Sequence, residues 1–458
     1  MISKPPQDKG SPRLGRLGLT CVIFFTVSGG AYGLEPLVGS LDPGWAVALI
    51  LITPLLWCLP IAWMVSELSS ALPAEGGYYA WVREGLGSFW GFQEGWWTLC
   101  YTAIDMAIYP VLFVDYLAYF YPSVALPSSG SPSWRVFIFR WLIALAVILS
   151  AFVVNARGIR MVGRSSAVTT ALVLAPFGVL TFIGLDHWSS LENAFSAIRY
   201  GLTRGHNAHF LALGLAVVLW NYSGWDNVST FAAEVKHASR SYPAALAAAQ
   251  ILIVVAYLLP VLAGVGRTSS PALWSESAGW PEIARLVAGN WLAAAVAAMG
   301  VVSAWSMFNS QLLYVSRLPS AMALDGWFPS SLARISVSAG VPMASLGLAC
   351  AVAGIAAALP FTKLVVIDIL LYSAELLLEF LALIALRLKR PEMERPFRVP
   401  WGWPGVILVS VLPLGLAGVV AVATLEGGSV LRLGIIPVVI LSGVVIYFAR
   451  RGISRRPI

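Results

Sequence analysis

The stretch Ala212–Ala233, ALGLAVVLWNYSGWDNVSTFAA, begins as an apolar helix and then changes character in its middle. From Asn221 to Asn227 it carries polar and flexible residues, where a helix that spans a membrane is usually most uniformly apolar. Backbone N–H and C=O groups cannot remain unpaired in hydrocarbon, so such a break is tolerated only where it faces protein, water or a ligand. We therefore interpret this stretch as a broken helix that forms one half of a substrate site, and we expect a second broken helix to supply the other half.

The composition of the chain is that of a polytopic membrane protein. Of its 458 residues, 59% are hydrophobic and 11% are charged, and the mean hydropathy is +0.80. Apolar stretches of about twenty residues, the length that crosses a bilayer, recur with only short connections. We therefore predict an all-α integral membrane fold of twelve transmembrane helices in one bundle. The predicted spans are residues 17–39, 45–71, 89–120, 135–156, 163–185, 207–232, 242–266, 289–318, 342–359, 362–387, 404–425 and 432–450.

The basic residues indicate how these spans are oriented. If the N-terminus is cytoplasmic, about 21 of the 29 Lys and Arg residues fall on the cytoplasmic side. We therefore expect a multi-pass protein of the plasma or inner membrane, with both terminal tails, residues 1–16 and 451–458, in the cytoplasm. The N-terminal tail is too poor in apolar residues to be a cleavable signal. The net charge of +7 is interpreted as attraction to anionic lipid headgroups, and a nucleic-acid partner is not expected.

Cysteine and histidine usage gives no sign of a metal site. Cys21, Cys58, Cys100 and Cys350 all fall within predicted spans. No two of them have C-x-x-C spacing, and no histidine cluster accompanies them. We expect buried free thiols, no bound metal and no cofactor.

A second interruption occurs in the first span, at Ser28-Gly29-Gly30-Ala31-Tyr32-Gly33. Each glycine costs a helix roughly 1 kcal/mol relative to alanine, so two half-helices are expected, with a small-residue packing face as the alternative. Breaks in the first and sixth spans are the pattern expected if residues 17–185 and 207–387 are inverted repeats that hold the substrate between the breaks. Residues 388–403 are then a cytoplasmic loop, and residues 404–450 form two appended helices.

Several motifs resemble one transporter superfamily. The run Glu67–Val82, ELSSALPAEGGYYAWV, resembles the loop after the second helix in the amino acid, polyamine and organocation (APC) superfamily. Gly85–Trp96 and Ile104–Tyr116 look like the third helix of its polyamine-uptake branch, and Leu378–Pro400 repeats this likeness. In these motifs the chain is similar to the polyamine-uptake and L-type amino acid transporters.

The resemblance implies a secondary transporter that works by alternating access. It assigns Trp220 to an aromatic gate over the substrate, and Gly224 to a position that leaves room for the substrate side chain. Leu172 stands about where a lysine in some relatives takes the place of a sodium ion, and Leu324 replaces a basic residue of the relatives. Light chains of heteromeric transporters carry a cysteine in the outer loop after the third helix. Residues 121–134 have none, so no disulfide-linked heavy chain is expected.

The two breaks offer opposite partial charges. The N–H groups from Gly29 to Tyr32 lie at the start of a half-helix and can hold a carboxylate. The unwound carbonyl groups around Trp220 to Ser223 can hold an ammonium group. Together the two breaks fit a zwitterion.

Six acidic residues lie within or at the edge of the spans, where each ionised carboxylate costs about 2.5 to 3.5 kcal/mol. Glu35 follows the first break and acts either as a helix cap or as an amine ligand. Asp226 follows the second break, where similar L-type transporters carry asparagine, and it either binds a second amine or caps a restarted helix. Asp105 and Tyr109 are one turn apart and can line one pocket, whereas Asp115 lies nearer the outer end and is expected to be solvated. The candidate substrate-binding residues are Ser28, Gly29, Gly30, Ala31, Tyr32, Glu35, Asp105, Tyr109, Trp220, Asn221, Tyr222, Ser223, Gly224, Trp225 and Asp226.

The remaining candidates concern ion coupling. Glu375 and Glu379 lie one turn apart and either share a proton or form a structural pair bonded to neighbouring helices. Ser303 and Ser306 could supply oxygens to a sodium ion, although serines in membrane helices often bond their own backbone. We predict proton-coupled import of amino acids or polyamines, with sodium as the less favoured ion. The alternative function is a non-transporting sensor or complex subunit on the same fold. No nucleophile and base pair or P-loop indicates an enzyme or an ATP-driven pump.

Overall fold

The structure is a computed structural model that describes residues 14–74, 76–125, 133–186, 188–205, 208–274, 279–336, 338–358, 365–426 and 430–454. Within these ranges the chain is built of helices and forms no strand. The tail segments 1–13 and 455–458, and residues 126–132 of the predicted outer loop, lie outside the described residues. The predicted all-α architecture is confirmed for the part of the chain that is described.

The described part of the first half of the chain contains eight α-helices and two short helical turns of other types. They are α1 (Arg16–Val27), α2 (Glu35–Thr53), the π-helical η1 (Pro54–Cys58), α3 (Leu59–Ala71), α4 (Tyr78–Leu86), α5 (Ser88–Leu117), the 3-10 helix η2 (Pro122–Val124), α6 (Trp134–Asn155), α7 (Ile159–Gly184) and α8 (Trp188–Thr203).

The described part of the second half is likewise built of α-helices and short 3-10 helices. Its helices are α9 (Ala208–Asn221), the 3-10 helix η3 (Asn227–Glu234), α10 (Ala238–Arg267), α11 (Pro271–Trp274), α12 (Trp280–Ala288), α13 (Asn290–Leu324), the 3-10 helix η4 (Ser330–Ala333), α14 (Met343–Ala356), α15 (Val365–Lys389), α16 (Gly402–Glu426) and α17 (Val430–Ser454).

Length and composition make this a multi-pass membrane protein. Eight helical segments of the described chain are long and apolar enough to cross a membrane. Three shorter apolar helices accompany them, at Arg16–Val27, Met343–Ala356 and Pro437–Arg450. The count of twelve spans stays a prediction. From the third span on, the helix that corresponds to each predicted span begins and ends within about six residues of it, except at the sixth span, where α9 ends at Asn221.

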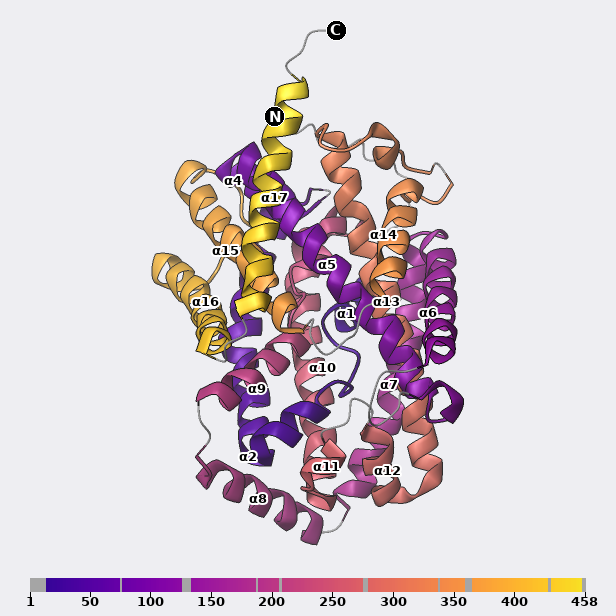
Figure 1. The fold of residues 1–458 in the computed structure, drawn as a ribbon. Helices are drawn as coiled ribbons and strands as arrows, with labels where there is room; N and C mark the ends of the chain where they lie inside the picture. The colour runs from indigo at the N-terminus through magenta and orange to yellow at the C-terminus, as the bar shows by residue number, and fades with distance from the viewer. Residues whose placement is uncertain are drawn as a thin grey trace.

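Two features of the connections differ from the prediction. The predicted boundary between the first two spans is a kink inside α2, where Asp42 adopts φ 63° immediately before Pro43. The connections after α7 and α10 contain α8, α11 and α12, which hydropathy does not predict because they are too short to span a bilayer. Figure 1 shows these three helices at the end of the molecule opposite the chain termini.

Burial separates the central helices from the peripheral ones. In α15, 78% of the most apolar window is buried inside the protein, and in α5 the share is 67%, whereas in α6 it is 22%. Figure 1 places α1, α5, α10 and α13 in the middle of the bundle, with α6 and α16 on opposite sides. The two broken segments therefore lie among helices that can supply polar partners away from lipid.

Candidate functional site

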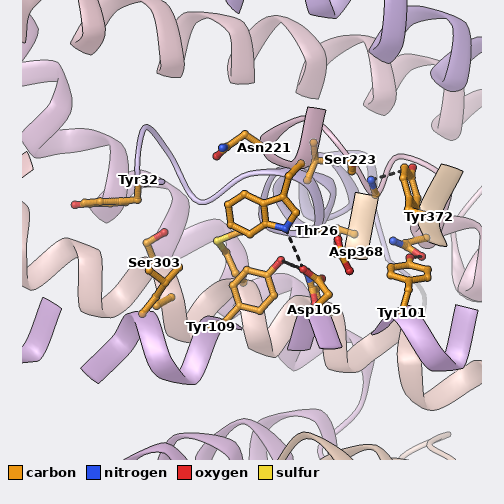
Figure 2. Close-up of a pocket in the computed structure, with 18 of the residues that line it drawn as sticks. Thr26, Tyr32, Tyr101, Asp105, Tyr109, Asn221, Ser223, Ser303, Asp368 and Tyr372 are labelled. Carbon is orange, nitrogen blue, oxygen red and sulfur yellow. Dashed lines mark hydrogen bonds between the residues drawn. The ribbon is translucent and has the colours of Figure 1, made fainter. Parts of the chain in front are cut away.

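A small cavity lies between the two helix breaks (Figure 2). Its walls come from the end of α1, the two breaks, and the facing sides of α5, α13 and α15. The cavity volume is about 30 Å³, which is room for about two water molecules, so its walls must separate before a larger substrate can enter. The lining residues are Thr26, Val27, Tyr32, Tyr101, Asp105, Tyr109, Leu112, Tyr116, Trp220, Asn221, Ser223, Gly224, Asn227, Gly300, Ser303, Ala304, Met307, Gln311, Asp368 and Tyr372.

The first break is where the sequence placed it, between the end of α1 and the start of α2 at Glu35. Gly30 and Gly33 adopt φ values of 89° and 88°, which glycine reaches without steric cost. Side chains satisfy the exposed carbonyl groups: Trp280 Nε1 donates to Ala31 O at 2.7 Å, and Ser303 Oγ donates to Gly29 O. The expected half-helices are therefore formed, and the break is stabilised by protein partners.

The predicted anion site at this break is partly occupied by the protein itself. The Gly30 N–H donates to Ser28 Oγ at 3.1 Å, and the Gly33 N–H donates to Glu35 Oε2 at 2.7 Å. The other carboxylate oxygen of Glu35 accepts a hydrogen bond from Tyr116 Oη at 3.0 Å. Glu35 is fully buried and is not part of the cavity wall. The carboxylate of Glu35 thus pairs with the loop before α2 and with Tyr116, and neither predicted role, helix cap or amine ligand, is shown.

The second break follows α9 and ends in a 3-10 helix. Gly224 adopts φ 95°, and a Cβ atom there would lie 2.9 Å from the carbonyl oxygen of Thr26. The space at Gly224 is therefore taken by the backbone of α1, which corrects the expectation that it leaves room for a substrate side chain. The carbonyl groups of Asn221 and Tyr222 accept hydrogen bonds from Tyr257 Oη and Trp225 Nε1 at 2.6 and 2.8 Å. They are less available to an ammonium group than the sequence suggested.

The negative charge of the cavity comes instead from two carboxylic acids on separate helices. Asp105 of α5 and Asp368 of α15 both line the cavity, and they are 5% and 3% exposed. Asp105 accepts hydrogen bonds from Tyr109 Oη at 3.0 Å and from Trp220 Nε1 at 3.3 Å. Asp368 Oδ1 accepts none from the described residues. Figure 2 shows Asp368 between Asp105 and Tyr372 in this view. None of the lining residues is Lys or Arg.

Aromatic side chains form much of the remaining wall. Tyr109 Oη, which donates to Asp105, accepts a hydrogen bond from Gln311 Nε2 at 2.5 Å. Tyr32 packs against Tyr116 with ring centroids 4.9 Å apart. Aromatic faces attract cations through their quadrupoles, so the wall and the two carboxylates favour the same kind of ligand.

The predicted binding residues are thus divided between the cavity wall and the layer behind it. Asp226 and Trp225 are fully buried outside the wall, and so is Tyr222, whose hydroxyl group donates to Ile50 O at 3.1 Å. The side chain of Asp226 makes no capping hydrogen bond to η3; its Oδ1 accepts one from Tyr372 Oη. The predicted binding residues in the wall are Tyr32, Asp105, Tyr109, Trp220, Asn221, Ser223 and Gly224, and the coupling candidate Ser303 also lies there. Those outside it are Ser28, Gly29, Gly30, Ala31, Glu35, Tyr222, Trp225 and Asp226.

The residues considered for ion coupling lie in different surroundings. Ser306 Oγ donates to Val302 O of its own helix at 2.8 Å, so only Ser303 contacts the first break. Leu172 is 47% exposed and points away from the bundle, which corrects the expectation for that position. The α7 side chain closest to Gly30 is that of Val173. The position on α7 that faces the first break therefore also carries no lysine.

The acidic pair of α15 is buried. Glu375 and Glu379 are both fully buried, and Glu375 Oε2 accepts a hydrogen bond from Thr98 Oγ1 at 2.6 Å. Both oxygens of Glu379 are without a hydrogen-bond partner among the described residues. A hydrogen bond to a neighbouring helix, which one of the two predicted alternatives requires, is therefore seen for Glu375 but not for Glu379 among the described residues.

Charged residues near the ends of the bundle are paired, which corrects the expectation for Asp115. Asp115 is not solvated: it forms an ion pair with Arg140, and the two side chains are 15% and 10% exposed. Leu324 is exposed, and the neighbouring Asp325 accepts hydrogen bonds from Arg83 and from Tyr79 Oη. Burial and the bond to Asp325 raise the pKa of Tyr79, so this phenol stays neutral and acts as a donor. The basic residue that Leu324 replaces is thus not needed to pair Asp325.

Several residues of the cavity wall were not predicted from the sequence. Asp368 and Tyr372 lie on α15 at the spacing of Glu375 and Glu379, so the helical periodicity of that span could have found them. Tyr101 lies one turn from Asp105 on α5 and could have been found in the same way. Gln311 and Met307 carry no comparable signal, because neither residue type is unusual in a buried helix.

Comparison with known proteins identifies the family of the chain. A family model described as amino acid permease matches residues 14–446. A polyamine transporter of Oryza sativa subsp. japonica is 35% identical over 430 residues, which are 92% of this chain and 77% of that protein. A probable polyamine transporter of Arabidopsis thaliana is 32% identical over 416 residues, 90% of this chain and 82% of its own. A methylthioribose transporter of Bacillus subtilis (strain 168) is 26% identical over 415 residues, 88% of this chain and 84% of its own. The chain therefore belongs to the amino acid permease family of membrane transporters.

Proposed function

We propose that this permease transports polyamines by alternating access, and that an inward proton gradient drives their uptake. The observation that carries the substrate assignment is that Asp105 and Asp368 line one cavity and that none of its described lining residues is basic. A buried carboxylate requires a counter-charge. A polyamine supplies ammonium groups, whereas a neutral amino acid adds a carboxylate of its own.

The first break supports this choice. A substrate carboxylate would need free N–H groups at Gly29 to Tyr32, and the Gly30 N–H already donates to Ser28. Glu35 occupies the Gly33 N–H and would repel a second carboxylate. The names of the rice and Arabidopsis relatives agree with an amine substrate.

The architecture expected for this mechanism is the one predicted from the sequence. We propose twelve spans, of which the first ten form two inverted repeats with the substrate between their broken helices. Both termini lie in the cytoplasm in this arrangement, because the basic residues are concentrated on their side. Widening of the narrow cavity toward one side and then the other provides access.

Uptake of radiolabelled putrescine into proteoliposomes tests the substrate assignment. In Asp105→Asn the amide oxygen still accepts the hydrogen bonds from Tyr109 and Trp220, but the charge is lost. We expect putrescine affinity to fall by about tenfold or more, the loss of one ion pair in a dry site. Glu282→Gln, which changes an exposed carboxylate on α12, is the matched control and is expected to behave as wild type. Wild-type protein that takes up neutral amino acids and no polyamine would overturn the assignment.

A further inference from the structure

Two rows of polar side chains face each other along α5 and α15, with equal spacing in opposite chain directions. On α5 the row is Glu94, Thr98, Tyr101 and Asp105. On α15 the opposing row is Glu379, Glu375, Tyr372 and Asp368. Steps of four, three and four residues keep each row on one helix face. We call these eight residues the acidic seam.

Specific contacts show that the two rows meet. Thr98 Oγ1 donates to Glu375 Oε2 at 2.6 Å. The rings of Tyr101 and Tyr372 lie with centroids 5.6 Å apart. The other two pairs are within electrostatic range of each other, Asp105 with Asp368 and Glu94 with Glu379. The seam begins in the cavity, passes the two tyrosines and runs toward the end of the molecule where α4 lies (Figure 1).

The part of the seam beyond the tyrosines is buried, and apart from Glu375 Oε2 its carboxylate oxygens have no hydrogen-bond partner among the described residues. Glu94 and Glu379 are fully buried, and none of their four carboxylate oxygens has a hydrogen-bond partner among the described residues. Asp226 faces the same region from the start of η3, and its Oδ2 is also without a described partner. The strongest charged neighbours of Glu94 and of Glu379 are other carboxylates.

Two buried tyrosine hydroxyl groups near these carboxylates also lack a hydrogen-bond partner among the described residues. Tyr78 of α4 and Tyr314 of α13 are buried, and their hydroxyl groups have no described hydrogen-bond partner. Both lie within electrostatic range of Glu375 and Asp226. Buried hydroxyl and carboxylate groups are nearly always paired in proteins, so polar atoms from α4, α5, α13, α15 and the start of η3 converge here on an unfilled requirement for a donor or a cation.

We propose that the far part of the acidic seam is a second ammonium site, which binds the distal amine of a long polyamine whose first amine lies between Asp105 and Asp368. The proposal rests on the proposed function. Tyr101 and Tyr372 separate the two sites, and their rings provide cation–π contacts to the inner ammonium groups of a long polyamine. Protons and an ammonium group can neutralise the four carboxylates of this region together, so amine binding there is compatible with proton coupling.

The distance along α15 between the cavity and the second ammonium site makes binding at both sites depend on the length of the polyamine. Asp368 and Glu379 are eleven residues apart, and at the rise of an α-helix this is about 16 Å. The nitrogens of extended putrescine are about 6 Å apart, and a hydrogen bond adds about 3 Å at each end, so a diamine bridges about 12 Å. Putrescine is too short to reach both sites, whereas spermine, with ten carbons and two further amines between its ends, is long enough.

Calorimetric titration of the purified full-length protein with putrescine and spermine tests the proposal. We expect wild-type protein to bind spermine about tenfold more tightly than putrescine, the effect of one added ion pair. Glu379→Gln and Glu94→Gln, placed on opposite helices, are each expected to bring this ratio close to one while putrescine affinity changes by less than about twofold. Glu282→Gln is the control that leaves both affinities unchanged. Melting curves without ligand show whether each variant is folded.

The outcomes separate this proposal from the proposed function. If both seam variants keep the wild-type ratio, or weaken putrescine and spermine by the same factor, the second ammonium site is wrong. If putrescine binds and Asp105→Asn abolishes its binding in the same experiment, the polyamine assignment stands without the seam. If wild-type protein binds no amine at all, the polyamine assignment itself is wrong.

Discussion

The hydroxyl group of Tyr372 joins the second helix break to a buried carboxylate. It donates a hydrogen bond to Asp226 Oδ1 and accepts one from the Gly224 N–H at 3.0 Å. Tyr372 lines the cavity, whereas Asp226 lies behind it. The charge of Asp226 therefore acts on a ligand in this cavity through Tyr372 and through space.

This relationship predicts the effect of neutralising Asp226. We expect Asp226→Asn to reduce uptake of putrescine and spermidine by about tenfold, and uptake of any neutral amino acid much less. If the effect passes through the shared hydrogen bond, Tyr372→Phe reduces polyamine uptake similarly, and the double variant loses little more than either single variant. Uptake into proteoliposomes measures both. Equal losses for polyamines and amino acids would contradict a role for this charge in amine recognition.

A second prediction concerns the backbone of the same break. Gly224→Ala places a Cβ atom 2.9 Å from Thr26 O at a backbone φ of 95°. A non-glycine residue held in such a conformation costs about 1 to 3 kcal/mol, and the backbone of α1 cannot move aside cheaply. We expect a lower melting temperature and a loss of uptake.

The matched control for this variant is Gly178→Ala in α7. Nothing lies within 4 Å of a Cβ atom at Gly178, and alanine is the better helix former by about 1 kcal/mol. We expect unchanged or slightly higher stability there. An equal loss of stability in both variants would show that the close approach to Thr26 is not the cause.

The sequence predicted the breaks because their signal is local. Glycines at Gly29, Gly30 and Gly33, or at Gly224, interrupt an apolar helix whatever surrounds them. The spans were predictable for the same reason, since hydropathy is a property of each segment. The short helices α8, α11 and α12 have no hydropathy signal of this kind, because they are too short to cross a bilayer.

Local sequence signals could not predict whether a given carboxylate lines the cavity or lies behind its wall. Spacing places Asp368 and Glu379 on one face of α15, but it does not say that Asp368 reaches the cavity and Glu379 lies beyond two tyrosines. Glu35 and Asp226, which follow the breaks directly in sequence, lie behind the wall because Tyr116 and Tyr372 stand in front of them. These relationships depend on how α5 and α15 are rotated against the broken helices, which only the packed structure provides.

The last prediction concerns the driving ion. Glu94, Glu375 and Glu379 are fully buried, and the cost of buried ionised carboxylates favours the binding of protons when no amine is present. We expect an imposed inward proton gradient to accelerate putrescine uptake into sodium-free proteoliposomes, and a protonophore to remove the acceleration. Glu375→Gln, whose amide oxygen can still accept the hydrogen bond from Thr98, is expected to make uptake less dependent on the gradient, whereas Glu282→Gln is expected to leave the dependence unchanged. An absolute requirement for sodium would point instead to Ser303 and the carbonyl groups of the first break as the ion site.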